Sequence, residues 1–271
     1  LTKVALRSPE GQTSFQLLPR GAFEALEETV ERVRPEVLGL TGGGAAKLAK
    51  LLGKKAVEVC EFTAWGAGAN RLLTPQKDEN FLLVSLGTGT SVMAVEGTKV
   101  RRLGGTALGG GTILGLGRAL CECQDFAETC SLAYAGRRDS VDLLVRDIYS
   151  DADTPLNGDL TASAFGRLGR TDDKASRQDL AASIMRLVGE NVALIAGGLA
   201  RSSGIAKIVY GGSTLRGNQA LASVLLEISK LQGMQASILK DGEFAGALGA
   251  LETAPHPDRD QDRQRSESVP I

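Results

Sequence analysis

The sequence predicts an α/β fold made of two similar halves. Strand-like and helix-like segments alternate along residues 1–252, and glycine-rich loops follow apolar strands in both halves. The 271 residues are 42% hydrophobic and 23% charged, which is ordinary for a globular protein with a sizeable core. Length and patterning together favour one or two domains built on mixed sheets.

In the first half, runs of apolar residues alternate with segments whose apolar residues recur at helical spacing. Gly11 separates the first two strands, and Gly42-Gly43-Gly44 follows the third. The expected elements are strands Leu1–Leu6 and Thr13–Leu18, helix Gly21–Val33, strand Val37–Leu40, helix Ala45–Leu52, strand Ala56–Val59 and helix Phe62–Leu73.

The second half repeats this alternation after a hairpin. Its expected elements are the hairpin Phe81–Val95, helices Thr112–Cys121 and Asp125–Ala135, a polar connection Ser150–Gly158, helix Arg177–Arg201, strand Ala206–Tyr210, helix Asn218–Lys230, strand Gln235–Leu239 and helix Phe244–Leu251. From Thr253 the chain is polar and charged, which is typical of disorder. We therefore predict domains at 1–78 and 79–252, a ligand cleft between them and a disordered tail at 253–271.

Charge and composition exclude several classes of function. The net charge of −1 gives no bulk attraction for nucleic acid or a membrane surface, and we expect neither as a partner. No apolar run reaches the length of about 18 residues that a membrane-spanning helix needs. The only histidine, His256, lies in the polar tail, so Ser-His-Asp hydrolysis and histidine zinc sites are excluded.

Cysteine usage indicates a reducing compartment. The chain has four cysteines, Cys60, Cys121, Cys123 and Cys130. No two of them form a C-x-x-C motif, and no secretory signal precedes them. Reduced and mostly buried thiols are the favoured state. We therefore expect a cytoplasmic protein.

The segment Val84–Thr112 is the most informative part of the chain. Gly87-Thr88-Gly89-Thr90 ends one apolar strand, and Gly109-Gly110-Gly111-Thr112 precedes a helix. Glycine lets backbone N–H groups approach a ligand, and threonine adds hydroxyl donors. Loops of this kind can hold phosphates at helix N-termini, although each alone could be a tight turn. Gly211-Gly212-Ser213 also follows a strand and precedes a helix, and a plain strand-to-helix turn is open there too.

Two charged groups stand beside these elements. Glu61 lies where an apolar strand gives way to a helix, a place where a carboxylate commonly caps the helix. Arg101 and Arg102 end the hairpin, and a guanidinium can bind a carboxylate through two hydrogen bonds. With no histidine in the core, a general base must be Asp, Glu, Lys or Tyr.

These motifs resemble those of the type II pantothenate kinases, the Fumble-like kinases of coenzyme A synthesis. The resemblance covers about residues 1–252, and the order and spacing of the motifs are more specific than any single one. The motifs are Glu61–Ala64 with Gly68, Gly87–Ser91, Arg102, Gly105–Thr112, Gly158–Ala162, Tyr210–Ser213, Leu215–Asn218 and Gly246–Ala250.

The resemblance implies a fold and a set of site residues. It implies two ribonuclease-H-like domains of the actin-like ATPase (ASKHA) fold, closing on ATP and Mg²⁺, with ATP-dependent phosphorylation of pantothenate to 4'-phosphopantothenate. Glu61 matches the family's catalytic base, and Arg102, Ser91 and Thr88 match substrate-binding positions, with Arg101 as an alternative to Arg102. The nucleotide-binding residues by this resemblance are Gly87, Thr88, Gly89, Thr90, Gly109, Gly110, Gly111, Gly211 and Gly212.

The resemblance also carries expectations beyond the active site. No residue of this chain is assigned to a metal. Asp159 and Thr161 could order a loop near the site or form a plain turn. A homodimer and feedback binding of an acyl-CoA are further implications of the family.

One family motif has no counterpart in the sequence. In the family, a strand and an Asp-x-Gly-Gly-Thr phosphate loop stand directly ahead of the segment that matches Leu1–Val4. We expect the first domain to lack this half-strand, and kinase activity and nucleotide affinity to be low without it. A truncated start is our interpretation.

Three alternatives remain open at this point. A sugar or acetamido-sugar kinase of the same superfold would bring Asp, Asn or His hydroxyl ligands, where this chain has Glu and Arg. An iron–sulfur ATPase of the dehydratase-activator type is suggested by Cys121 and Cys123, and would need these thiols to face a partner. A non-catalytic regulator is favoured by the missing loop and opposed by the presence of Glu61 and Arg102.

Overall fold

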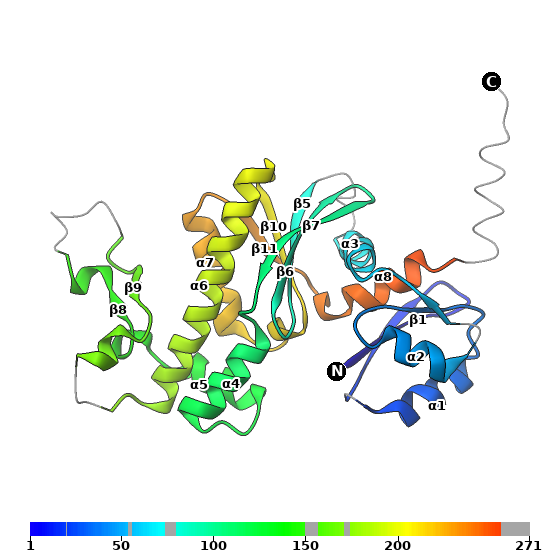
Figure 1. The fold of residues 1–271 in the computed structure, drawn as a ribbon, viewed down its shortest axis with the longest axis horizontal. Helices are drawn as coiled ribbons and strands as arrows, with labels where there is room; N and C mark the ends of the chain where they lie inside the picture. The colour runs from blue at the N-terminus through cyan, green and yellow to red at the C-terminus, as the bar shows by residue number, and fades with distance from the viewer. Residues whose placement is uncertain (20, 54–55, 74–79, 150–156, 171–173, 256–271) are drawn as a thin grey trace. The chain divides into compact units, whose positions relative to one another are not determined.

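The computed structural model describes residues 1–19, 21–53, 56–73, 80–149, 157–170 and 174–255 (Figure 1). The chain forms two compact units. Unit 1 comprises Leu1–Asn80, Met93–Arg102 and Leu239–Ile271, and unit 2 comprises Phe81–Val92 and Leu103–Ile238. The polar connection expected at Ser150–Gly158 lies mostly outside the described residues, as do 256–271 of the expected tail, including His256.

The sheet associated with unit 2 has five strands in the order β11-β10-β5-β6-β7. Their bounds are β5 Phe81–Leu86, β6 Thr90–Glu96, β7 Lys99–Thr106, β10 Lys207–Gly211 and β11 Gln235–Ile238. All six residues of β5 are buried, as the continuous apolar run predicts for a central strand. β10 is parallel to β5, with Tyr210 opposite Val84, so both strands end at the same edge of the sheet.

Four helices pack in unit 2, and their ends follow sequence signals. Their bounds are α4 Gly110–Cys121, α5 Phe126–Ala135, α6 Arg177–Ser203 and α7 Gln219–Leu231. Asp125, Ser176 and Asn218 cap α5, α6 and α7 by accepting a hydrogen bond from the N–H three residues on. Gly204 ends α6 in the left-handed conformation at φ 69°.

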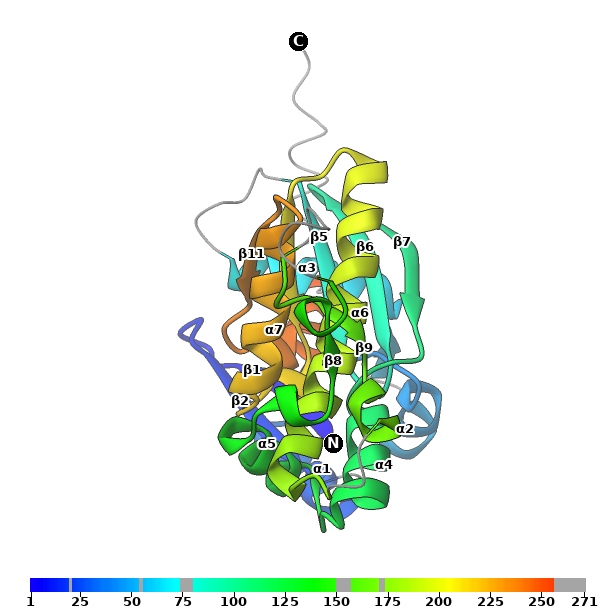
Figure 2. The ribbon, with the colours of Figure 1, turned by 90° about the vertical axis from the view of Figure 1, so that its left-hand side faces the viewer.

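The helix α6 is long and apolar enough by composition to cross a membrane, the one such helix in the described part of the chain. It packs against α4, α5 and α7, and 61% of its most apolar window is buried inside the protein. Both views show α6 running along the sheet with α7 beside it (Figures 1 and 2). These contacts identify α6 as the core helix of unit 2.

Unit 1 contains two small sheets and four helices. Strands β1 (Thr2–Arg7) and β2 (Thr13–Leu18) form an antiparallel pair, and β3 (Leu38–Leu40) and β4 (Ala56–Glu58) form a parallel pair. The helices are α1 Phe23–Val33, α2 Ala45–Leu52, α3 Glu61–Leu72 and α8 Ala245–Thr253.

Small residues bring α3 and α8 into close contact. A Cβ on Gly68 would lie 1.8 Å from the Ala245 carbonyl oxygen, and a Cβ on Gly249 would lie 1.6 Å from that of Ala64. The two helices can therefore pack this tightly only with glycine at both positions. This packing places the last helix of the chain in unit 1, although it is distant in sequence from α3.

The predicted helices and main strands agree with these elements to within about two residues at each end, as boundary assignments usually do. β7 was expected only as the end of a hairpin and is a full strand. The small sheet of β8 (Leu143–Leu144) and β9 (Thr161–Ser163) was not predicted, because two- and three-residue strands carry no periodicity. The contact-based units are interleaved along the chain, whereas the predicted domains, 1–78 and 79–252, are contiguous and stay a prediction.

The sheets of the two units differ at one place. In the five-stranded sheet, β5 lies between the β6–β7 hairpin and the parallel pair β10–β11. In unit 1, no strand of the described residues lies between the β1–β2 hairpin and the parallel pair β3–β4. Both β1 and β3 pack on α8, since Arg7 is ion-paired with Glu252 and Gly39 contacts Ala250.

Candidate functional site

Three glycine-containing loops of unit 2 meet at one edge of the five-stranded sheet. Gly87–Gly89 follows β5, Gly212 follows the parallel strand β10, and Gly109 precedes α4. Because the carboxyl ends of parallel strands share an edge, the first two loops lie side by side. The structure thus brings together the nine positions that the sequence assigns to nucleotide binding.

Hydrogen bonds fix the first loop to the other two. Gly110 N donates to the Gly87 carbonyl oxygen at 2.8 Å, and Gly111 N donates to that of Thr88 at 2.9 Å. The Thr214 hydroxyl also donates to the Gly87 oxygen at 2.8 Å, from the segment that follows β10. The loop after β5 is therefore held from both sides.

Glycine is required where these loops touch. A Cβ on Gly109 would lie 2.8 Å from the Gly89 Cα, and one on Gly110 would lie 2.5 Å from the Thr214 hydroxyl oxygen. Gly212 has a φ of +112°, and its Cβ would lie 2.2 Å from the Leu86 carbonyl oxygen. Any side chain at these positions would push the loops apart.

The hydrogen bonds divide the predicted nucleotide-binding residues into two groups. The first group already donates hydrogen bonds within the protein. It comprises the N–H groups of Gly110 and Gly111 and the Thr90 hydroxyl, which donates to the Leu108 carbonyl oxygen at 2.8 Å. The N–H groups of Thr88 and Gly89 and the Thr88 hydroxyl donate to no atom of the described residues. Adjacent free N–H groups on a rigid loop form a concavity suited to a phosphate.

The three loops, Gly87–Gly89, Gly109–Gly111 and Gly212–Thr214, together form a cradle. Thr214 belongs to this cradle and was not predicted from the sequence. It is 4% exposed, and its hydroxyl is the only side-chain donor to the Gly87 carbonyl oxygen among the described residues. The Gly211-Gly212-Ser213 motif marks the loop, but nothing in the sequence distinguishes Thr214 from its neighbour Ser213. Only the parallel pairing of β5 with β10 shows which hydroxyl reaches Gly87.

Glu61 is the first residue of α3 and belongs to unit 1. The helix is preceded by Cys60 in the capping position, and no side chain makes a capping hydrogen bond there. The Glu61 carboxylate is exposed and makes no hydrogen bond with the described residues. The carboxylate is therefore not used as a cap in this structure, and it stays available to a ligand.

Arg102 is an exposed residue of β7 and also belongs to unit 1. Val100 packs against Gly66, and Asn70 Nδ2 donates to the Gly97 carbonyl oxygen at 2.8 Å, so α3 runs antiparallel to the start of β7. Arg101 and Arg102 are both exposed. The sequence leaves Arg101 and Arg102 open as the substrate-binding arginine, and the preference for Arg102 stays a prediction.

Ser91 is the second residue of β6 and is half-buried. Its neighbour Thr90 is buried, so the side chains of the two residues lie on opposite faces of the strand. The substrate-binding roles of Ser91 and Thr88 stay predictions.

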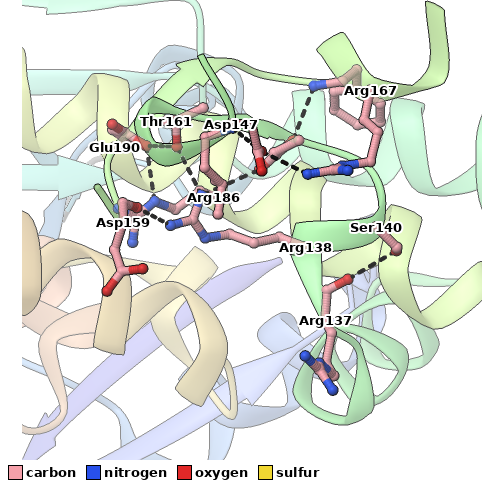
Figure 3. A network of polar contacts seen from close by, with 12 residues as sticks. Arg137, Arg138, Ser140, Asp147, Asp159, Thr161, Arg167, Arg186 and Glu190 are labelled. Atoms are coloured by element: carbon pink, nitrogen blue, oxygen red, sulfur yellow. Dashed lines mark hydrogen bonds and ion pairs between the residues drawn. The ribbon is translucent and has the colours of Figure 1, made fainter. Parts of the chain in front are cut away.

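Asp159 and Thr161 belong to a polar network on α6 (Figure 3). The Thr161 hydroxyl donates to Glu190 Oε2 at 2.7 Å, and Arg138 donates to the Thr161 oxygen at 3.0 Å. Asp159 is ion-paired with Arg146. These contacts tie β9 to α6 and favour a structural role for this motif.

Buried arginine and carboxylate groups extend the network. Arg186 is 3% exposed and donates to Glu190 at 2.8 Å and to Glu227 at 2.9 Å and 3.0 Å. Burial, together with the nearby Arg186 charge, lowers the pKa of Arg138. Burial raises the pKa of Asp142, against the effect of a hydrogen bond from Phe165 N.

The cysteine pair suggested by the sequence lies in the core of unit 2. Cys121 is 0% exposed and Cys123 is 3% exposed. Burial raises the pKa of Cys121 to about 11. Thiols enclosed in one chain cannot ligate a cluster across a dimer, so the structure opposes the iron–sulfur alternative. No group of three metal-binding side chains occurs among the described residues.

The chain is similar in sequence to one family of kinases. Residues 58–253 match the family model described as Fumble. The type II pantothenate kinase of Oceanobacillus iheyensis is 37% identical over 254 residues, which cover 93% of this chain and 95% of the relative. That of Bacillus anthracis is 34% identical over 256 residues, 93% of each chain.

Solved structures with the same fold are more distant in sequence. A ROK family glucokinase from Streptomyces griseus, in complex with glucose and AMPPNP, has a TM-score of 0.57 at 15% identity and covers 93% of this chain and 96% of its own. The activator of 2-hydroxyisocaproyl-CoA dehydratase from Clostridium difficile, with bound ADPNP, has a TM-score of 0.59 at 15% identity. This match covers 96% of this chain and 90% of the activator. These matches confirm the predicted ASKHA-type α/β fold.

Proposed function

Because this chain belongs to the Fumble family of type II pantothenate kinases, we propose that it transfers the γ-phosphoryl group of ATP to pantothenate. The observation that carries this function is the match to curated pantothenate kinases over 93% of both chains. The product, 4'-phosphopantothenate, enters coenzyme A biosynthesis. The free N–H groups of the cradle and the exposed Glu61 and Arg102 are consistent with this chemistry.

The loop after β5 is the proposed phosphate-binding element for ATP. Thr88 and Gly89 offer free N–H donors, and Gly110, Gly111 and Thr214 hold the loop in shape. A pre-organised loop binds a phosphate without the cost of ordering itself. Mg²⁺ enters with the nucleotide, since this ion usually retains waters and takes most of its ligands from substrate phosphates.

Glu61 and Arg102 are the proposed substrate-binding residues of unit 1. Pantothenate carries a primary hydroxyl at one end and a carboxylate at the other. Glu61 accepts the proton of the hydroxyl, and Arg102 binds the carboxylate through its two forked N–H donors. Thr88 and Ser91 are proposed to donate hydrogen bonds to the same substrate.

Assembly, location and regulation are further parts of the proposal. A homodimer rests on the family resemblance. A cytoplasmic location fits four free cysteines, of which Cys121 and Cys123 are buried. Feedback binding of an acyl-CoA rests on the family resemblance alone.

Two other functions compete with pantothenate phosphorylation. Another small-molecule kinase of this superfold is favoured by the structural likeness to a glucokinase, although 15% identity supports the fold and not the substrate. A non-catalytic, kinase-like regulator is the other candidate, and the presence of Glu61 and Arg102 opposes it.

The test is a coupled assay of ADP release from MgATP, run in parallel with pantothenate, glucose and N-acetylglucosamine. We expect release with pantothenate only, and a product whose mass has increased by one phosphoryl group. Equal or greater turnover with a sugar would favour the second function. Binding of ATP or acyl-CoA without turnover of any acceptor would favour the regulator.

A further inference from the structure

Trp65 is the only tryptophan of the chain, and nothing above assigns it a role. It lies on α3 four residues after Glu61, so the two side chains project from the same face of the helix. Long side chains of an α-helix also lean towards its N-terminus, where Glu61 stands. The next residues on this face, Ala64 and Gly68, are small. The indole is therefore the one large side chain on the face of α3 that carries the proposed general base.

The loop between β3 and α2 passes close to both side chains. A Cβ on Gly246, at the start of α8, would lie 3.4 Å from Trp65 Nε1 and 3.8 Å from the methyl carbon of Thr41. A Cβ on the next loop residue, Gly42, would lie 4.0 Å from Glu61 Oε1. Consecutive residues of one loop thus lie near the indole nitrogen and near the carboxylate. These contacts are independent of the helix geometry and place both groups in one neighbourhood of unit 1.

Two polar groups of this neighbourhood have no hydrogen-bond partner in the described part of the chain. Trp65 is half-buried, and its indole N–H donates to no atom there. The Thr41 hydroxyl oxygen is buried and is also unpaired. A buried indole N–H usually has an acceptor, and a buried polar group without one costs free energy. Both groups are suited to a ligand that brings oxygen atoms to them.

The proposed acceptor has the chemistry that such a place binds. In pantothenate, the carbon that bears the primary hydroxyl is bonded to a carbon with two methyl groups. The following carbons carry a secondary hydroxyl and an amide carbonyl. A primary hydroxyl held at Glu61 therefore brings an apolar branch and two oxygens to the side chains beside this carboxylate. An indole offers an apolar face and one N–H donor, which match a branch followed by an oxygen.

We propose that Trp65 is a specificity-determining residue of this kinase. Its ring packs against the two methyl groups of the acceptor, and its Nε1 donates a hydrogen bond to the oxygen that follows them. The contact selects a primary alcohol next to a dimethyl-substituted carbon, a group that a sugar lacks. This inference rests on the proposed function and deepens it, because it assigns the hydroxyl-bearing half of the substrate to α3.

The first test uses the tryptophan fluorescence of the wild-type chain, which comes from Trp65 alone. The chain is titrated with pantothenate and with its two halves, pantoate and β-alanine, and calorimetry measures binding in parallel. We expect pantothenate and pantoate to change the emission, and β-alanine, which lacks the methyl groups, to leave it unchanged. Emission that stays constant while calorimetry detects bound pantothenate would overturn the proposal.

The second test compares Trp65→Ala and Trp65→Phe on pantothenate and on an analogue in which hydrogens replace the two methyl groups. We expect the wild type to have a kcat/KM for the analogue roughly tenfold or more below that for pantothenate, as missing methyl groups in an apolar pocket cause. Trp65→Ala should lose most of this discrimination, with the KM for MgATP unchanged. Trp65→Phe keeps an aromatic face and should retain most of it.

Phe23→Ala is the matched control for the second test. Phe23 is a half-buried aromatic residue of unit 1 at the start of α1, where the Lys47 ammonium lies 4.9 Å from its ring centroid. This variant should discriminate between the two acceptors as the wild type does. A Trp65→Ala variant with wild-type discrimination refutes the contact with the methyl groups. If that variant fails to fold, the fluorescence of the wild-type chain decides.

Failure of the proposed function has a different signature. Wild-type protein that neither binds nor phosphorylates pantothenate would count against that function. Wild-type turnover of pantothenate, combined with unaltered discrimination in Trp65→Ala, counts against this inference alone.

Discussion

The carboxylate of Glu61 is exposed, makes no hydrogen bond with the described residues and stands on the first residue of α3. We predict that Glu61→Gln lowers kcat about 10²–10⁴-fold, because the amide keeps the size of the side chain and loses its basicity. ATP binding, measured by calorimetry, should be unchanged. Glu58→Gln, at the exposed end of β4, is the matched control and should retain full activity. A Glu61→Gln variant with more than about a tenth of wild-type kcat would point to a structural role.

Arg101 and Arg102 are neighbouring exposed residues of β7, and the family resemblance assigns the carboxylate of the substrate to Arg102. We predict that Arg102→Ala raises the KM for pantothenate about ten- to hundredfold, since a hydrogen bond to a charged group contributes about 1.5–3 kcal/mol. The KM for ATP should change little. Arg101→Ala is the control, and a larger effect there would move the assignment by one residue.

The cysteines differ in their expected reactivity. The nearby N–H and hydroxyl of Thr63 lower the pKa of the exposed Cys60 thiol, whereas burial raises those of Cys121 and Cys130 to about 11. The thiolate is the nucleophile, so its fraction at neutral pH is larger at Cys60. We predict that iodoacetamide at pH 7.5 modifies Cys60 before Cys121 and Cys130, as peptide mass mapping would measure. In urea all should react, and equal rates in the native protein would contradict the burial argument.

At the scale of elements, the cradle depends on glycine at its contacts. A Cβ on Gly110 would lie 2.5 Å from Thr214 Oγ1 and 3.0 Å from the Gly87 carbonyl oxygen, whereas one on Gly115 of the same helix has nothing within 4 Å. We predict that Gly110→Ala raises the KM for ATP about tenfold or more, because overpacking costs about 1–3 kcal/mol.

The matched control is Gly115→Ala, which should leave the KM for ATP unchanged. It should stabilise the protein by roughly 0.5–1 kcal/mol, since glycine is unfavourable inside a helix. The readouts are steady-state kinetics and urea unfolding of both variants. Identical kinetics for Gly110→Ala and Gly115→Ala would show that the loop tolerates displacement.

At the scale of the whole molecule, the two units differ in their sheets. β5 is fully buried between its neighbours, whereas β1 is only partly buried along its length and no described strand joins it to β3. An unpaired strand edge leaves backbone groups without partners. We predict that joining a strand with an Asp-x-Gly-Gly-Thr loop ahead of Leu1 raises both the Tm and the affinity for MgATP.

The measurement is a thermal-shift titration with MgATP, which gives the Tm and the nucleotide affinity of the chain with and without this segment. A segment with the same strand and a Ser-x-Ser-Ser-Thr loop is the control, which should raise Tm and leave nucleotide affinity unchanged. If the chain without either segment already gains several degrees from ATP and the extension adds nothing, the first loop is dispensable.

The sequence by itself determined the alternation of elements, the glycine loops and the family motifs. Long helices with clear caps, such as α6 after Ser176, follow from local chemistry, because periodicity and capping are properties of neighbouring residues. The assignments of Glu61 and Arg102 also come from the sequence, through motif order, and stay predictions. The short strands β8 and β9 were not, since their few residues carry no period.

Only the tertiary structure decided which groups within the motifs are free. Gly110 and Gly111 donate their N–H groups to the loop after β5, and Thr214 reaches that loop from the segment after β10. The placement of α8 on α3 was likewise beyond the sequence. These facts depend on contacts between segments far apart in the chain, and local spacing cannot encode the register of one strand or helix against another.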